Sequence, residues 1–222
     1  MKYLKLALSF FLLMFCFNHL QAQQKFPFWD EIQKFKSQDS LHFPPKNAIL
    51  FVGSSSFTKW TDVQNYFPGY KIINRGFGGS SLPDVIHYAN DIIVPYHPKQ
   101  VVIYCGENDL AASDTVTSKM VFNRFKNLFT MIRKKLTLVP ILFISIKPSP
   151  SRQKLMPKMV AANEMIKRFL SKNKKATFAD VYHKMLKVDG QPMDDIFIED
   201  KLHMNAKGYA IWQKEIKPYL LR

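Results

Sequence analysis

Five short runs of apolar residues recur along the chain, each almost continuously hydrophobic and rich in Ile, Val and Phe. The runs are Ala48–Val52, Tyr70–Asn74, Gln100–Cys105, Pro140–Ile146 and Thr177–Val181. A strand that is covered on both faces has no polar face to alternate with its apolar one. The pattern therefore predicts five buried strands.

Longer amphipathic stretches separate these runs. The predicted helices are Leu82–Val94, Val116–Lys135, Gln153–Lys172 and Asn205–Leu221. In the last stretch Tyr209, Trp212 and Ile216 recur at helical spacing, and Asn205 is placed to cap the helix start. Strand and helix in repeated alternation predict an α/β fold, with a five-stranded parallel sheet and helices on both faces. Ligands of such sheets bind at the carboxyl ends of the strands.

The N-terminus has the pattern of a targeting segment. Lys2 and Lys5 precede the apolar run Leu6–Phe17, and Ala22 offers a small residue for cleavage. The run is shorter than the roughly 20 residues that span a bilayer, so we expect a secretory signal peptide over residues 1–22. A retained anchor helix is the alternative. Residues 23–222 are then expected to form one domain, either periplasmic or secreted.

Composition narrows the class of protein. The formal net charge is +15, and cleavage would remove two lysines and no acid, leaving +13. It would also remove Cys16 and leave Cys105 alone, so neither a disulfide scaffold nor a Cys-rich zinc fold is expected. The basic stretch 147–175 has Phe169 as its one aromatic residue, which gives no base-stacking platform. We therefore expect no specific nucleic-acid partner, and a weak attraction to anionic envelope surfaces instead.

Two Gly- and Ser-containing motifs follow the first two predicted strands. Ser55 lies after Gly53, where a hydroxyl can be presented at a helix start. A capping serine is the plain alternative, and a phosphate loop lacks its Gly-Lys-Ser/Thr ending. Gly79 belongs to a glycine-rich turn that can expose N–H donors. A flexible turn is the alternative there, and the spacing does not fit a dinucleotide fingerprint.

Two polar motifs follow later elements. Asn108 comes after the third predicted strand, and its amide can donate a hydrogen bond into a cleft or close an Asx turn. Asp200 and His203 precede the last helix at a spacing that lets a carboxylate orient an imidazole. A metal site is not expected, because the remaining histidines lack paired ligand spacing: His42, His87, His97 and His183.

Together and in order, these motifs resemble the SGNH hydrolase superfamily, the GDSL esterases and lipases, and are most similar to its platelet-activating-factor acetylhydrolase-like branch. The resemblance implies a three-layer flavodoxin-like fold, and ester hydrolysis without a metal or other cofactor. It also implies a Ser55, His203 and Asp200 triad, with Ser55, Gly79 and Asn108 as oxyanion donors. Ser54 stands where the family has Asp; we expect it to bond locally to the turn and catalysis to survive.

The expected activity is removal of acetyl or other short acyl groups from a carbohydrate or lipid ester through an acyl-enzyme. Transfer of the acyl group to a sugar, or binding of envelope polysaccharide without catalysis, are the alternatives. Cys105 is expected to be a buried apolar residue rather than a nucleophile. Arg152 is expected to be a solvated surface residue rather than a contact for an anionic substrate. The sequence predicts neither the alcohol nor the oligomeric state.

Overall fold

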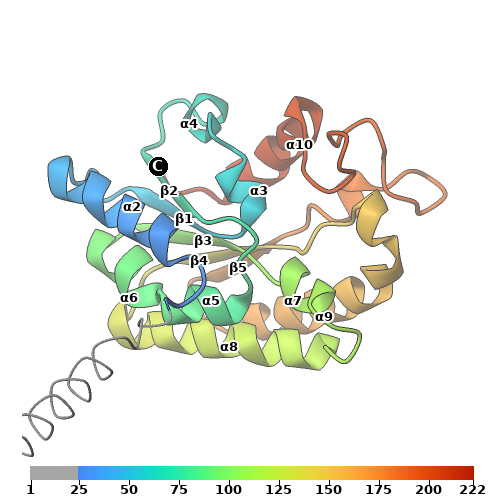
Figure 1. Ribbon diagram of the computed structural model, residues 1–222, viewed down its shortest axis with the longest axis horizontal. Coiled ribbons are helices and arrows are strands. Elements are labelled where there is room, and N and C mark those ends of the chain that lie inside the picture. Colours follow the sequence, from blue (N-terminus) through green and yellow to red (C-terminus); the bar gives the residue numbers. More distant parts are fainter. Residues whose placement is uncertain (1–24) are drawn as a thin grey trace, which may run out of the picture.

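Five parallel strands form the centre of the computed structural model, which describes residues 25–222 (Figure 1). They are β1 (Ile49–Gly53), β2 (Ile72–Gly76), β3 (Gln100–Tyr104), β4 (Ile141–Ile144) and β5 (Ala176–Ala179). The spatial order is β2-β1-β3-β4-β5, and every neighbouring pair is parallel. This is the strand order of flavodoxin-like sheets, so the predicted fold class is confirmed. Each predicted run overlaps one strand, with ends displaced by no more than two residues.

The two faces of the sheet are buried in separate hydrophobic clusters. Along β1, Leu50 and Val52 face one cluster, while Ile49 and Phe51 face the other. This alternation follows from the two-residue period of a strand. Because both faces are covered, every residue of β1 and β3 is buried, which explains why these strands are continuously apolar.

Helices cover both faces (Figure 1). The first cluster lies under α2 (Trp29–Leu41), α5 (Leu82–His87), α6 (Ala89–Ile92), α8 (Ser118–Lys135) and α9 (Met156–Ser171). The second lies under α3 (Ser55–Thr58), α4 (Val63–Tyr66) and α10 (Ala206–Ile216). The short helix α7 (Glu107–Ala111) follows β3, and 3-10 turns occur at Val94–Tyr96, Pro150–Leu155, His183–Met185 and Lys217–Tyr219. The result is the predicted three-layer arrangement.

Several helix predictions need correction. The stretch Leu82–Val94 is two helices and a turn, because the backbone leaves helical angles at Tyr88 (φ −93°, ψ 6°). The last helix ends at Ile216 and is followed by a tighter turn that contains Pro218, which has no N–H to continue the helical ladder. The capping role predicted for Asn205 is confirmed, since its side chain accepts from the N–H groups of Lys207 and Gly208.

Helix α2 was not among the predicted elements. Ile32 is its fully buried residue, and most of its remaining side chains are polar, so its apolar stripe is too narrow to stand out in the sequence. It packs beside α6. Near the C-terminal end of α2, Asp39 pairs with Arg75 and accepts a hydrogen bond from Tyr96.

The predicted signal segment lies outside the described residues. Within residues 25–222, no helix combines the length and apolar character needed to cross a membrane.

Candidate active site

Ser55 opens α3 directly after the end of β1. Gly53, two residues earlier, has φ +140°, and a Cβ there would lie 1.8 Å from the Tyr104 carbonyl oxygen. Only glycine therefore lets β1 approach β3 this closely. The Ser54 N–H donates to that same carbonyl at 3.0 Å. The Ser54 side chain makes no capping hydrogen bond to α3, so the local bond expected of it is absent.

Asp200 and His203 form one compact turn before α10. One carboxylate oxygen, Oδ1, accepts from the backbone N–H groups of Leu202 and His203, both at 2.9 Å. The other, Oδ2, lies 2.5 Å from His203 Nδ1. The carboxylate thus fixes both the turn and the imidazole ring.

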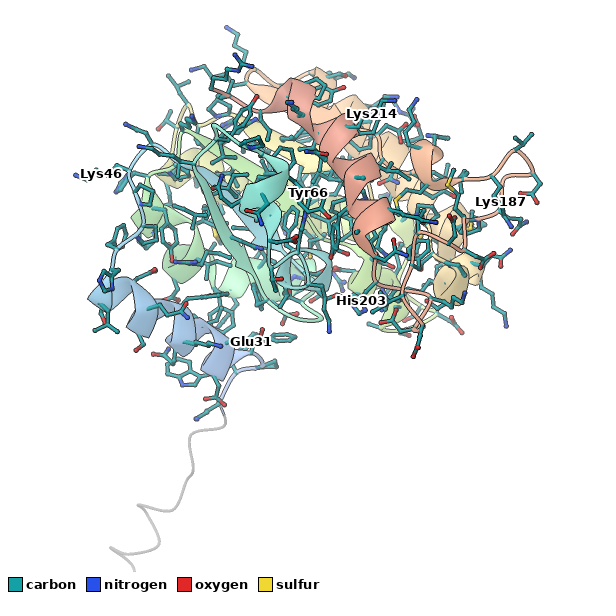
Figure 2. All side chains as sticks on the ribbon, turned by 90° about the horizontal axis from the view of Figure 1, so that it is seen from above. Glu31, Lys46, Tyr66, Lys187, His203 and Lys214 are labelled. Carbon is teal, nitrogen blue, oxygen red and sulfur yellow. The ribbon has the colours of Figure 1, made fainter. Side chains whose placement is uncertain are left out.

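Ser55 and His203 meet although 148 positions separate them. Ser55 Oγ lies 2.9 Å from His203 Nε2. Because Asp200 accepts at Nδ1, that nitrogen carries the proton and Nε2 is left to accept from the serine hydroxyl. The structure thereby joins all three residues that the sequence nominated as a triad. Figure 2 shows His203 beside the start of α10, away from Lys214 at the other end of the helix.

The electrostatics of this turn favour an ionised carboxylate. Burial would raise the pKa of Asp200, but hydrogen bonds from the His203 ring and from the N–H groups of His203 and Leu202 outweigh it. Together they lower the pKa to about 2. Asp200 is therefore charged throughout the ordinary pH range, as a residue that stabilises an imidazolium must be.

Hydrogen bonds of Ser80 link the three segments that carry the nominated oxyanion donors. The Ser80 hydroxyl donates to the Gly53 carbonyl at 3.1 Å, and Asn108 Nδ2 donates to the Ser80 carbonyl at 3.0 Å. Gly79 adjoins Ser80, is exposed and has φ +70°. Among the described residues, neither the Gly79 nor the Ser55 N–H has a protein acceptor. Both donors, together with the second amide hydrogen of Asn108, are available to an incoming oxygen.

The N-terminal helix borders this oxyanion loop. Glu31 Oε2 accepts from the Gly78 N–H at 3.0 Å. Two ring atoms of Phe28 lie 4.0 Å from where a Cβ on Gly79 would be. In Figure 2 Glu31 lies on the same side of the molecule as His203. This contact of Phe28 and Glu31 with the glycine-rich turn could not be predicted, because α2 precedes the first recognisable motif.

A buried charged cluster next to the Asp200–His203 turn was not predicted from the sequence. Glu107 lies 3.1 Å from Lys147 Nζ and accepts from the Tyr104 hydroxyl at 2.6 Å. Lys147 is fully buried and donates to the Leu202 carbonyl at 2.8 Å. Burial lowers the pKa of Lys147, and the Glu107 carboxylate opposes that shift. A lysine directly after the apolar run of β4 was the one available signal, and it is weak.

Arg152 requires a correction. It was expected to be solvated, but its side chain is only 19 % exposed. Its Nη2 donates to Asn108 Oδ1 at 2.9 Å, and its Nη1 lies 3.5 Å from Glu107 Oε1. These two acceptors come from α7, and neither contact was visible in the sequence.

Cys105 directly follows β3 and is fully buried. Burial raises the pKa of its thiol well above the usual range, so it is a poor nucleophile. Asp180 and His183 repeat the Asp-x-x-His spacing with a 2.7 Å contact, but His183 makes no contact with Ser55. Within residues 25–222, no cluster of His, Cys, Asp and Glu is arranged to hold a metal ion.

Comparisons with known proteins agree with this geometry. Residues 51–211 match the model of the GDSL-like lipase/acylhydrolase family. No curated protein sequence matches the chain.

Solved structures share the fold. A structure from Streptococcus pneumonia, provisionally described as a platelet activating factor, has a TM-score of 0.75 at 21 % identity and covers 97 % of this chain and 99 % of its own. A GDSL-like lipase from Bacteroides thetaiotaomicron has a TM-score of 0.71 at 17 % identity, covering 85 % and 96 %. A catalytic mutant of an acetylxylan esterase from Geobacillus stearothermophilus has a TM-score of 0.62 at 14 % identity, covering 78 % and 93 %.

At these identities the structural likeness establishes the fold, while the family model also covers the sequence motifs of the site. Since that model spans most of the chain, from β1 into α10, the chain belongs to the GDSL-like lipase/acylhydrolase family and is an ester hydrolase.

Proposed function

We propose that this protein is a serine esterase that works through an acyl-enzyme formed on Ser55. The observation that carries the proposal is the unbroken chain of hydrogen bonds from Asp200 through His203 to Ser55. A general base takes the hydroxyl proton directly during attack when it lies within hydrogen-bond reach, about 3 Å. His203 Nε2 meets that requirement at 2.9 Å.

In the first half of the proposed reaction, Ser55 Oγ bonds to the ester carbonyl carbon while His203 takes its proton. The carbonyl oxygen becomes an oxyanion held by the Ser55 and Gly79 N–H groups and by the Asn108 amide. Collapse of the intermediate breaks the bond to the alcohol, which leaves with the proton from His203. Each oxyanion donor of this kind is typically worth about 3 to 4 kcal/mol of the barrier.

In the second half, water replaces the alcohol. His203 removes a proton from the water, whose oxygen attacks the acyl carbon, and the same donors hold the new oxyanion. The acid is released as Ser55 recovers its proton from His203. Asp200 stabilises the imidazolium in both halves without itself taking a proton.

We infer a short acyl group, acetyl above all, carried on a carbohydrate or lipid alcohol. The structural relative that is an acetylxylan esterase supports an acetyl group. The same relative supports a carbohydrate ester. The N-terminal apolar run supports export of the protein to the periplasm or beyond.

The test compares two Asp-x-x-His pairs. Ser55→Ala and His203→Ala are each expected to lower hydrolysis of p-nitrophenyl acetate by at least about 10⁴-fold, as for other serine hydrolases. His183→Ala is the matched control, since His183 has the same spacing to an aspartate but no contact with the serine, and it should keep the wild-type rate. Full activity in Ser55→Ala would overturn the proposal. A rate series from acetate to palmitate tests the acyl size separately.

A further inference from the structure

Arg152 joins two neighbouring side chains of α7 although it belongs to a different loop, the 3-10 turn Pro150–Leu155 that follows β4. Its Nη2 donates to Asn108 Oδ1 at 2.9 Å, and its Nη1 lies 3.5 Å from Glu107 Oε1. The backbone of Arg152 interrupts the turn at φ −120° and ψ 26°. The guanidinium thus contacts the oxygen of the Asn108 amide, while the nitrogen of the same amide is the proposed oxyanion donor.

The Asn108 amide has two orientations that differ by a half turn. In the observed one, Nδ2 donates to the Ser80 carbonyl and Oδ1 accepts from Arg152. In the flipped one, Nδ2 would face the guanidinium and Oδ1 would face a carbonyl oxygen, so both contacts would be repulsive. A guanidinium has donors only and stays protonated. Arg152 thus favours the orientation that leaves an N–H for the oxyanion.

Arg152 is itself held by Glu107, a member of the buried cluster that also contains Tyr104 and Lys147. Glu107 accepts from the Tyr104 hydroxyl and pairs with Lys147, whose ammonium is fully buried. Lys147 neutralises the carboxylate, so the positive charge of Arg152 is left in excess beside Asn108. A fixed positive charge next to an amide donor strengthens the donor and stabilises negative charge that develops in front of it.

We propose that Arg152 is a positioning residue of the esterase. It locks the Asn108 amide with Nδ2 toward the oxyanion and polarises it, while Glu107, itself paired with Lys147, holds the guanidinium in place. This inference rests on the proposed function, in which Asn108 is an oxyanion donor. The interaction matters most when charge develops on the substrate oxygen, so it should act on kcat rather than on KM.

Steady-state kinetics with p-nitrophenyl acetate test the role. Arg152→Gln is expected to lower kcat by about 10- to 100-fold with KM within about twofold, less than the 10²- to 10³-fold loss typical of deleting a donor itself. Arg152→Lys keeps the charge but not the planar pair of donors, so its kcat should lie between those of wild type and Arg152→Gln. Lys154→Gln, an exposed cation two residues away, is the matched control and should keep the wild-type values.

A double-mutant cycle separates positioning from general support of the fold. With Asn108→Ala as background, Arg152→Gln should change kcat by no more than about twofold, because the amide it positions is gone. An equal loss in both backgrounds would overturn the proposal. So would a wild-type kcat in Arg152→Gln. Melting temperatures of all variants check that each one is folded.

A charged substrate distinguishes the positioning role of Arg152 from direct binding of an acidic substrate. Arg152 also lines a surface hollow of about 770 Å³, where it could instead bind an acidic substrate. If Arg152→Gln raised KM only for a p-nitrophenyl ester with a carboxylate on its acyl group, and left kcat unchanged, binding would replace positioning as its role. Ser55→Ala in the same assay keeps the two proposals apart: if it is inactive while Arg152→Gln is normal, only the positioning role fails.

Discussion

At the scale of single residues, Asp200 and His203 form one hydrogen-bonded turn. Three hydrogen bonds within four positions fix the carboxylate against the backbone and the ring. The unit needs only Ser55 from elsewhere in the chain to complete a triad. Its geometry is set by local sequence, and its partner is set by the fold.

The lowered pKa of Asp200 predicts a pH-dependent contribution to stability. Its value of about 2 in the folded protein lies below the ordinary 3.8, so the folded state favours the carboxylate. That contribution is fully present above about pH 4 and is lost as the pH falls through 2. Wild type should therefore exceed Asp200→Asn in unfolding free energy at pH 5, and the difference should shrink toward pH 2. Urea unfolding at several pH values measures it.

Asparagine does not titrate, so subtracting the variant removes the acid response of every other group that the two proteins share. A difference in unfolding free energy that stays constant from pH 5 to pH 2 would contradict the assigned role of the Asp200 hydrogen bonds.

The sequence could nominate Ser55 because it follows the first predicted strand, and the Asp200–His203 pair because it precedes the last predicted helix, where the family resemblance places this motif. Spacing alone could not choose between the pairs, since Asp180 and His183 share the same spacing and contact. Contact with Ser55 distinguishes them, and that requires the fold. Arg152 could not be predicted for the same reason: its acceptors lie 44 and 45 positions away.

At the scale of elements, α2 shows where periodicity fails. One fully buried residue, Ile32, is too little for an apolar stripe to reveal a helix. The helix is instead held by long-range polar contacts, of Asp39 with Arg75 and of Glu31 with Gly78. In the same way, the break at Tyr88 coincides with a hydrogen bond from its hydroxyl to the Pro27 carbonyl at 2.9 Å, which no local pattern encodes.

The contact between α2 and the oxyanion loop predicts a kinetic effect. Glu31→Ala removes the acceptor of the Gly78 N–H, and a hydrogen bond to a charged acceptor contributes about 1.5 to 3 kcal/mol. Part of that loss should appear as looser placement of Gly79, with kcat for p-nitrophenyl acetate falling by up to about tenfold. Lys34→Ala, on the same helix but exposed, is the control. A Glu31→Ala enzyme that loses stability but keeps kcat would show that α2 only supports the fold.

At the scale of the whole molecule, the parallel sheet explains why distant motifs meet. Ser55, Gly79 and Asn108 follow the carboxyl ends of β1, β2 and β3, which are adjacent in the sheet. Trp212 of α10 is fully buried and packs edge-on against Phe57 of α3, with ring centroids 6.1 Å apart. That packing brings the helix after His203 against the helix that begins at Ser55. The apolar runs predicted the five strands well, because strands covered on both faces leave a clear signal. The order of the strands in the sheet was implied only by the family resemblance.

The net charge of +15 is a property of the molecule rather than of the site. We propose that the excess of Lys and Arg acts through long-range attraction to anionic surfaces. The chain beginning at Gln23 should co-sediment with vesicles containing phosphatidylglycerol at about 0.01 M salt, where charges act over about 30 Å. It should be released at about 0.15 M, where the range is about 8 Å. Vesicles of phosphatidylcholine alone are the control and should bind little at either salt concentration. Binding that persists at high salt, or that is equal on both lipids, would point to apolar contacts instead of charge.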